Sequence, residues 1–234
     1  MMKVAALSDR GVKRSSNEDA FLRDDEEKIF IVADGIGGLA DGAFASAFVV
    51  KSLYESIRGN LPASPDGVLT ALSTAIMRTN SELFGKKKGS SGATAMVLCL
   101  NGSSALFAHA GDCKLYLLRD GALSQLNSEH SLVWRLWREG ILPKDEMAAH
   151  PYRNVVERAL GLNESIEPET GEAEVLPGDS LLIATDGVTA DLSMEDISSL
   201  LNSGGVTAER LEALAALSKE RGGSDNFTGI LIDL

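Results

Sequence analysis

The 234-residue sequence lacks long hydrophobic runs. Its longest apolar stretches are shorter than ten residues, whereas a membrane-spanning helix needs about 20. The N-terminus also lacks the basic segment followed by an apolar segment that marks a secretory leader. We therefore expect neither a transmembrane helix nor a signal peptide, and we expect a cytoplasmic protein.

Positive charge is scarce as well. The chain has 22 Lys and Arg residues against 34 Asp and Glu residues, which gives a formal net charge of −12. Nucleic acids and anionic membranes are bound through cationic surfaces, so this balance argues against both as partners. With 44% hydrophobic residues, the chain is long enough to bury one sizeable core. We predict a single domain over residues 1–234.

Residues that form disulfides or bind zinc are few. Cys99 and Cys113 both lie in apolar runs, where a buried, reduced thiol is the usual state, so no disulfide is expected. The three histidines, His109, His130 and His150, lack the i, i+4 spacing of a zinc-binding helix. We expect His109 to lie in a strand near Asp112 and the other two histidines to order the segment of residues 127–162 that contains them.

Apolar patterns in the remaining sequence predict an α+β protein. Runs rich in Val, Ile and Leu predict strands at residues 3–8, 28–34, 93–100, 104–110, 114–119, 172–175, 181–185 and 227–234. Apolar residues at helical spacing predict helices at residues 42–58, 65–83, 194–201 and 208–219. Because groups of strands and pairs of helices are segregated along the chain, we expect antiparallel sheets covered by helices.

Turn residues indicate how the strands connect. A charged turn at residues 24–28 indicates a first hairpin. Asn101-Gly102 and Gly111-Asp112 separate the apolar runs from residue 93 to residue 119, which predicts an antiparallel meander. Residues 127–162 break this rhythm with short helical patches, and a long insertion of this kind is often a functional lid. We name this segment the flap.

Short elements containing Asp recur from one end of the chain to the other. They are Asn17-Glu18-Asp19, the VADGIGG segment of residues 32–38, Ala110-Gly111-Asp112, Ala184-Thr185-Asp186-Gly187 and Ser224-Asp225-Asn226. Most of them close an apolar run, so the fold can gather their carboxylates at strand ends in one cleft. Uncompensated buried carboxylates repel one another, whereas divalent cations that prefer oxygen ligands stabilise such a cluster. The pattern points to metal-assisted hydrolysis.

Two further features fit a site for a phosphorylated ligand. Asp34 is followed by Gly35, Gly37 and Gly38, which allow the backbone to turn sharply and to approach a ligand closely. Arg14 lies in a polar segment before the first acidic element, and its guanidinium fork matches the oxygens of a phosphate group.

Taken together, these elements resemble the PPM (type 2C) family of metal-dependent serine/threonine protein phosphatases in its short bacterial form. The match is nearly collinear, from Ser8-Asp9-Arg10-Gly11 to Asp225-Asn226, and the segments from His130 to Gly161 resemble that family's flap region. The resemblance implies a four-layer α-β-β-α sandwich, in which two antiparallel sheets are flanked by helix pairs and the metal centre lies at one edge.

The resemblance also implies a binuclear centre of Mn²⁺ or Mg²⁺. Asp34 would bridge the two ions with the Gly35 carbonyl on one of them, while Asp186 and Asp225 would hold the other. A water molecule that bridges two cations about 3.5–4 Å apart ionises near neutral pH, and the hydroxide can attack phosphorus in line. The catalytic set implied is therefore Arg14, Asp34, Asp186 and Asp225.

Further residues would support this centre. Glu18 and Asp19 would act through bound waters, and Asp112 would join Asp186 at a third, weaker metal site. Arg14 would bind the phosphoryl group of the substrate. The metals and Arg14 would also offset negative charge on the phosphoryl oxygens, where phosphoryl transfer needs electrostatic help.

The implied activity is hydrolysis of phosphoserine and phosphothreonine in proteins by a monomer that opposes a bacterial Ser/Thr kinase. Two alternatives are a catalytically silent sensor or docking module and a small-molecule phosphoesterase. Every acidic position expected at the metals is filled, which argues against the silent module.

Three positions depart from the family's pattern. Ile36 stands where many eukaryotic members have a His that can protonate the leaving alcohol, and an Ile side chain cannot donate a proton. Cys113-Lys114 replaces the usual Ser-Arg after Gly-Asp, and Glu129 replaces an Asp. The first departure leaves the leaving-group proton to another source, and the second affects positioning beside the third metal.

Overall fold

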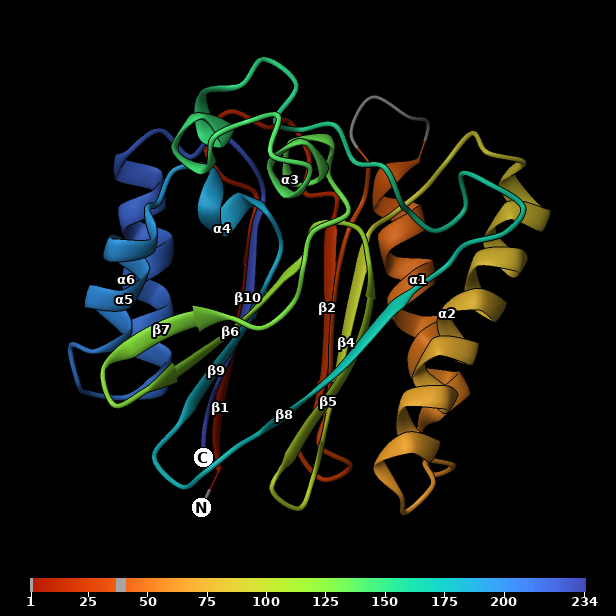
Figure 1. The fold of residues 1–234 in the computed structure, drawn as a ribbon, viewed down its shortest axis with the longest axis horizontal. Coiled ribbons are helices and arrows are strands. Elements are labelled where there is room, and N and C mark those ends of the chain that lie inside the picture. The colour runs from red at the N-terminus through yellow and green to blue at the C-terminus, as the bar shows by residue number, and fades with distance from the viewer. Residues whose placement is uncertain (1, 37–40) are drawn as a thin grey trace.

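The computed structural model describes residues 2–36 and 41–234. Two antiparallel five-stranded sheets pack face to face, with helices on the outer side of each (Figure 1). The first sheet has the order β1 (Lys3–Asp9), β10 (Phe227–Asp233), β9 (Ser180–Ala184), β6 (Lys114–Arg119), β7 (Ala122–Gln125). The second has the order β2 (Asp19–Asp24), β3 (Ile29–Asp34), β4 (Ala95–Asn101), β5 (Ser104–Ala110), β8 (Glu169–Glu174).

Helix pairs cover the outer faces of the two sheets. The pair α1 (Gly42–Ile57) and α2 (Pro65–Lys87) lies on the second sheet, while α5 (Met194–Leu201) and α6 (Thr207–Glu220) lie on the first (Figure 1). The start of α2 follows from its sequence, because the Ser64 side chain accepts a hydrogen bond from the Gly67 amide and Pro65 occupies the first turn. The predicted α-β-β-α sandwich is confirmed.

Three hydrophobic clusters separate the four layers. Strand β3 shows how one strand serves two of them, because alternate side chains of a strand point to opposite faces. Ile29 and Ile31 pack in the cluster formed with α1 and α2, whereas Phe30 and Val32 pack between the two sheets. A third cluster joins the first sheet to α5 and α6. A strand buried on both faces reads as a continuous apolar run, as residues 29–33 do.

The predicted meander is wrong at its third strand. Strands β4 and β5 pair as expected, but β6 leaves them and pairs with β9 and β7 in the other sheet. Gly111, with a φ of 115°, and Asp112 therefore carry the chain between the sheets instead of closing a hairpin. A Gly-Asp pair shows that the chain turns, but it does not encode which sheet the next strand joins.

Several elements were not predicted from the sequence. Strand β2 is one of them: the charged turn closes a hairpin, as expected, but the hairpin joins β2 to β3. The run at residues 3–8 pairs instead with β10 in the other sheet. Strand β7 and helix α4 (Gly187–Ala190) are each four residues long, too short for a periodic pattern. Cys99 and Cys113 are buried free thiols, as expected.

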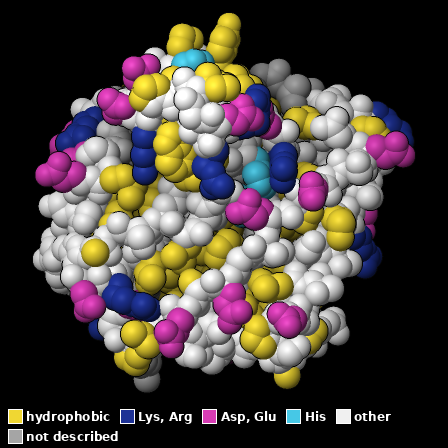
Figure 2. All heavy atoms as spheres, viewed as in Figure 1, with side chains coloured by type: hydrophobic (Ala, Val, Ile, Leu, Met, Phe, Trp, Pro, Cys, Tyr) yellow, Lys and Arg dark blue, Asp and Glu magenta, His cyan; other side chains and the backbone are white. Residues whose placement is uncertain are grey.

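The flap carries its own short helices, α3 (Leu132–Arg138) and the 3₁₀ helix η1 (Lys144–Ala149), which lie at the top of the molecule in Figure 1. On the face shown in Figure 2, acidic and basic side chains are interspersed, and hydrophobic side chains gather toward the middle. Among the helices of the described residues, none has the length and apolar character needed to cross a membrane.

Candidate active site

The acidic elements from distant parts of the chain meet at one edge of the two sheets. They surround a cavity of about 250 Å³. Its lining includes seven of the residues predicted for the site, namely Arg14, Glu18, Asp34, Gly35, Asp112, Asp186 and Asp225. Asp19 is not part of the lining, but it lies directly opposite Asp34 in the β2–β3 pair. Gly37 and Gly38 of the VADGIGG segment lie outside the described residues.

The first part of the cavity wall depends on close backbone packing around Gly35. The Gly35 amide donates a hydrogen bond to the Glu18 carbonyl oxygen at 3.0 Å. A Cβ atom on Gly35 would lie 2.3 Å from the Gly42 carbonyl oxygen and 2.7 Å from that of Glu18, so a side chain does not fit here. The Glu18 carboxylate itself lies against Gly42 at the start of α1. Glycine at position 35 therefore allows the start of α1 and Glu18, just before β2, to lie close to the residue after Asp34.

Another part of the cavity wall is built around Asn226. Its side-chain oxygen accepts a hydrogen bond from the Glu18 amide at 2.8 Å, and its side-chain nitrogen donates to the carbonyl oxygens of Arg10 and Ser16. A Cβ atom on Gly187 would lie 1.7 Å from the Asn226 carbonyl oxygen. The Asp-Gly pair after β9 and the Asp-Asn pair before β10 therefore fit together only because residue 187 is glycine.

Arg14 is held at the mouth of the cavity by Asp225. A terminal guanidinium nitrogen of Arg14 donates to Asp225 Oδ2 at 2.6 Å. The Arg14 side chain remains 42% exposed, so its other donors face solvent or an incoming ligand. This arrangement suits a cation that binds an anionic group beside the carboxylates.

Asp112 and Lys114 lie deeper, where the chain passes from β5 to β6. Lys114 is buried, donates to the Asp112 carbonyl oxygen at 3.1 Å, and lies 3.7 Å from Glu129 Oε2. The Asp112 carboxylate oxygen Oδ1 is buried and has no hydrogen-bond partner among the described residues, and the same is true of Asp19 Oδ1. Buried oxygens of this kind normally have a partner.

Burial and repulsion raise the pKa values of the carboxyl groups. Burial raises the pKa of Asp34 well above its usual value, and the nearby charges of Asp186, Asp19 and Asp112 add to this effect. Burial also raises the pKa of Asp112 to about 7, with a further contribution from Asp186, and it raises the pKa of Asp19 to about 6. Such shifts concentrate at functional sites and are reversed when cations neutralise the cluster.

The cavity suits hard divalent cations. Its carboxylate and carbonyl donors are oxygens, which Mg²⁺ and Mn²⁺ prefer. The two unpartnered oxygens of Asp19 and Asp112 are available for a metal or its water shell. The carboxylates of Asp19 and Asp186 both lie next to that of Asp34, so the acidic groups are closely grouped.

Comparison with known proteins agrees with this geometry. The family model described as protein phosphatase 2C matches residues 10–221. The chain belongs to the protein phosphatase 2C family. A putative protein phosphatase 2C-type protein of Streptococcus pyogenes is 32% identical over 238 residues, covering 99% of this chain and 97% of that protein. The serine/threonine phosphatase stp of Listeria monocytogenes is 31% identical, covering 99% and 96%.

Solved structures of protein phosphatases share the whole fold. The serine/threonine phosphatase of S. agalactiae superposes with a TM-score of 0.94 at 29% identity, and the alignment covers 100% of both chains. The catalytic domain of the phosphatase PstP, solved in complex with two manganese ions, gives a TM-score of 0.87 at 30% identity, covering 99% of this chain and 97% of that one. Metal dependence is thus a property of the family to which this chain belongs.

A second cavity adjoins the first in this phosphatase-family fold. Its volume is about 380 Å³, and its lining includes Arg14, Asp112, Asp186 and Asp225 together with flap residues such as Met147 and Arg153. The flap therefore forms one wall of a continuous hollow that begins at the acidic residues. Among the described residues that line the first cavity, none is a histidine, and Ile36 is present there.

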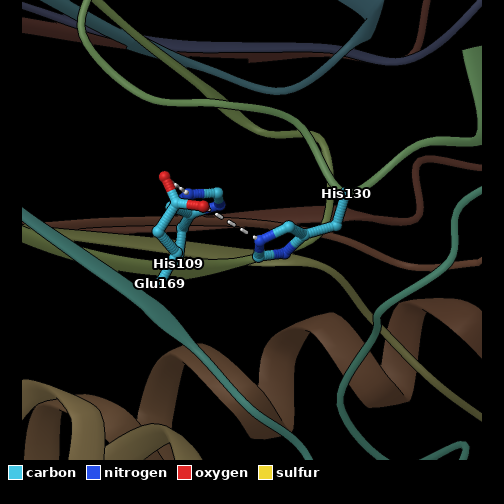
Figure 3. Close-up of side chains that lie close together, drawn as sticks. All are labelled: His109, His130 and Glu169. Atoms are coloured by element: carbon cyan, nitrogen blue, oxygen red, sulfur yellow. Dashed lines mark ion pairs between the residues drawn. The ribbon is translucent and has the colours of Figure 1, made fainter. Parts of the chain in front are cut away.

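One polar cluster of the phosphatase-family chain was not predicted. His109 on β5, His130 in the flap and Glu169 on β8 lie together, with all of their nearest ligand atoms within 4.8 Å (Figure 3). His109 lies in a strand, as expected. No spacing in the sequence could reveal the cluster, because its three members come from separate segments that only the tertiary fold brings together.

Proposed function

We propose that this chain is a metal-dependent protein serine/threonine phosphatase and that the acidic cavity is its active site. The observation that carries the proposal is the meeting of Asp34, Asp186 and Asp225 around one cavity with Arg14 at its mouth. A phosphate monoester needs both a cationic binding group and a way to offset charge on its oxygens, and this cavity offers a place for both.

The proposed metal ligands follow the positions around the cavity. Asp34, the Gly35 carbonyl, Asp186 and Asp225 would hold two Mn²⁺ or Mg²⁺ ions, with Glu18 and Asp19 acting through water. Asp112 would contribute to a third site. When bound, the cations supply positive charge that favours ionisation of water at neutral pH and offsets charge on the phosphoryl oxygens.

The chain's own residues would bind and orient the phosphorylated side chain. Arg14 is restrained by its hydrogen bond to Asp225, so its guanidinium loses less freedom when it meets a phosphoryl group. Asn154 and Val156 of the flap line the same cavity. The adjoining hollow under the flap offers room for the peptide on either side of the phosphorylated residue.

Protein substrates and an opposing Ser/Thr kinase belong to the same proposal. The relatives that carry the name serine/threonine phosphatase support a phosphoprotein as substrate. We further propose that the protein acts as a cytoplasmic monomer, organised as one domain over residues 1–234 with a flap at residues 127–162.

The alternatives are less well supported. A silent docking module would not need its buried carboxylates, whose repulsion disfavours the metal-free fold, yet they are all present. A small-molecule phosphoesterase would use the same centre, and the adjoining hollow under the flap favours a larger substrate. A direct comparison of substrates separates these functions.

The test is an assay of a phosphothreonine peptide and of a small aryl phosphate, each with Mn²⁺ and with chelator. We expect metal-dependent hydrolysis of the peptide. The variant Asp34→Asn should lose at least about 10³-fold in kcat, because it removes a carboxylate that would hold the metal ions. Asp120→Asn is the matched control, since Asp120 is exposed in a left-handed turn where Asn is tolerated. Equal rates with and without metal would refute the proposal.

A further inference from the structure

The cluster of His109, His130 and Glu169 lies outside the acidic cavity, at the base of the flap. Glu169 Oε1 lies 3.7 Å from His109 Nε2, and Glu169 Oε2 lies 3.5 Å from His130 Nε2 (Figure 3). Both histidines are buried, and the His109 ring nitrogens have no hydrogen-bond partner within the described residues. By residue type alone, two imidazoles and a carboxylate could hold a transition metal.

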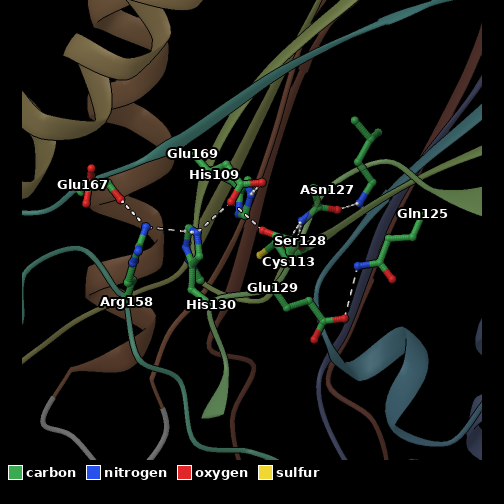
Figure 4. Close-up of polar contacts among 12 residues, drawn as sticks. His109, Cys113, Gln125, Asn127, Ser128, Glu129, His130, Arg158, Glu167 and Glu169 are labelled. Carbon is green, nitrogen blue, oxygen red and sulfur yellow. Dashed lines mark hydrogen bonds and ion pairs between the residues drawn. The ribbon is translucent and has the colours of Figure 1, made fainter. Parts of the chain in front are cut away.

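The hydrogen bonds of His130 argue against a metal at this cluster. The Gly111 amide donates to His130 Nδ1 at 3.1 Å, so Nδ1 carries the lone pair and the neutral ring carries its proton on Nε2. A protonated Nε2 cannot bind a metal. The guanidinium of Arg158 also lies 3.4 Å from Nε2, where it would repel a second cation (Figure 4). Burial lowers the pKa of His130 to about 4, with His109 and Arg158 adding to this effect, which agrees with a neutral ring.

His130 instead holds Gly111 by two hydrogen bonds. Its own backbone amide donates to the Gly111 carbonyl oxygen at 3.0 Å, while its ring accepts from the Gly111 amide. Gly111 has a φ of 115°, and a Cβ atom there would lie 2.4 Å from Thr94, so this residue is confined on its other side as well. The next residue is Asp112, whose Oδ1 has no partner in the described part of the protein. The orientation of Asp112 therefore depends on how its backbone is held.

His130 also contacts the far end of the flap and strand β8. The Glu157 amide donates to the His130 carbonyl oxygen at 2.7 Å, beside the bridge between Ser131 and Val156. On the other side, the Ser128 hydroxyl donates to Glu169 Oε2, the same oxygen that His130 approaches (Figure 4). One neutral imidazole thus connects the two ends of the flap, the β8 edge and the backbone that carries Asp112.

We propose that His130 is a positioning residue that orients Asp112 toward the third cation by accepting the hydrogen bond of the Gly111 amide. The inference rests on the proposed function, because it takes the third site from there. Groups that orient a metal ligand typically contribute about 10–100-fold to metal affinity. The effect should therefore appear in the weakest metal-binding step and leave the binuclear centre intact.

Two substitutions separate the two sides of the imidazole ring. In His130→Asn, the amide oxygen can take the place of Nδ1 and accept from Gly111, but nothing reaches Glu169. In His130→Gln, the longer amide can reach Glu169, but the acceptor for Gly111 is lost. Isothermal titration calorimetry with Mn²⁺ measures the binding steps, amide hydrogen exchange reports on the Gly111 N–H, and Asp112→Asn defines which step belongs to the third site.

We expect Asp112→Asn to remove one Mn²⁺-binding step. His130→Gln should weaken that same step by about 10-fold or more and should speed amide exchange at Gly111. His130→Asn should keep both close to the wild-type values, and both variants should retain the tighter binding steps. Equal weakening in the two variants would overturn the inference, since it would mean that the ring acts through packing. If Asp112→Asn removes a step that His130→Gln leaves unchanged, the inference fails while the proposed function stands. If Asp112→Asn removes no step, the third site of the proposed function fails as well.

Discussion

Asp19 and Asp34 lie directly opposite each other in the antiparallel β2–β3 pair. Like charges at such positions destabilise a sheet, and the partial burial of both residues increases the cost. The strand pairing that builds the acidic cavity thus places two carboxylates in conflict unless protons or cations neutralise them. In the metal-free protein, this repulsion lowers the stability of the fold.

We therefore predict that the metal-free protein loses stability as the pH rises from 6.5 to 8. A carboxyl group whose pKa is higher in the folded than in the unfolded chain stabilises the fold below the unfolded pKa, and this contribution is lost as the pH rises through the folded pKa. Asp112, with a pKa raised by burial to about 7, and Asp34, with a pKa raised by burial well above its usual value, meet this condition. Each can contribute a slope of up to about 1.4 kcal/mol per pH unit.

Urea unfolding in chelator at pH 6.5 and pH 8 measures this loss. Added Mn²⁺ should restore more stability at pH 8, because metal ligands bind in their deprotonated form. His130, whose pKa is lowered by burial to about 4, acts in the opposite sense only at the lower end of this window, where the unfolded imidazole still titrates. Asp112→Asn should show a smaller slope than the wild type. Stability that rises with pH in chelator would contradict the prediction.

The close contact between Gly187 and Asn226 gives a second prediction. Gly187→Ala places a methyl group where a Cβ atom lies 1.7 Å from the Asn226 carbonyl oxygen, so the two acidic elements must separate. We expect a loss of about 2 kcal/mol or more in the free energy of unfolding, as for other overpacked sites, together with weaker Mn²⁺ binding.

Gly85→Ala is the matched control. Gly85 lies in helix α2, and no atom lies within 4 Å of a Cβ atom built there. Alanine favours a helix over glycine by roughly 0.5–1 kcal/mol, so this variant should be as stable as the wild type or more stable. Chemical denaturation and calorimetric titration of both proteins provide the comparison. A Gly187→Ala protein with wild-type stability would show that the loops tolerate separation.

Much of the fold and site could be predicted because the relevant patterns are local. Asp34 and Asp186 each follow a run of buried strand residues and precede a glycine, and this pattern is visible within a few residues. Helix α2 was predicted for the same reason, since its apolar spacing and its Pro65 start lie in one continuous segment. Resemblance to a family then supplied the sandwich and the proposed role of each residue.

The sequence could not show which segments pair over long distances. Strand β6 looks like the next strand of a meander, yet it joins β9, more than 60 residues away, in the opposite sheet. The contact between His130 and Gly111 is another case, because an imidazole that accepts from a backbone amide leaves no periodic pattern. Such features depend on the packing of the two sheets as a whole.

Lys114 supplies a third prediction, since it is a buried cation between acidic groups. It lies 3.7 Å from Glu129 Oε2 and donates to the Asp112 carbonyl oxygen. Removing one partner of a buried ion pair costs roughly 3–5 kcal/mol, because the remaining charge is left uncompensated. We expect Lys114→Met to destabilise the metal-free protein by about 3 kcal/mol in urea unfolding and expect Lys114→Arg to retain much of the stability.

The control for Lys114 is an exposed ion pair on a helix. Lys51 lies 3.8 Å from Glu55 on α1, and its side chain is 75% exposed. Exposed pairs of this kind contribute about 0.3–0.5 kcal/mol, so Lys51→Met should be close to neutral. If Lys114→Met and Lys51→Met had similar stabilities, Lys114 would not be needed to balance the acidic residues around it.

Arg14 provides the last prediction, which concerns substrate binding. Its guanidinium is held by Asp225 and still 42% exposed, so it is available to a phosphoryl group. Hydrogen bonds to charged groups contribute about 1.5–3 kcal/mol, and we expect Arg14→Ala to raise KM for a phosphothreonine peptide by roughly 10–100-fold. The KM of Arg14→Lys should lie between those of the wild type and Arg14→Ala, since lysine keeps the charge but lacks the planar guanidinium fork. Arg10→Ala, at an exposed position outside the cavity lining, should leave KM unchanged. Steady-state kinetics at saturating Mn²⁺ distinguish these outcomes, and a wild-type KM with normal kcat in Arg14→Ala would exclude a role for Arg14 in phosphate binding.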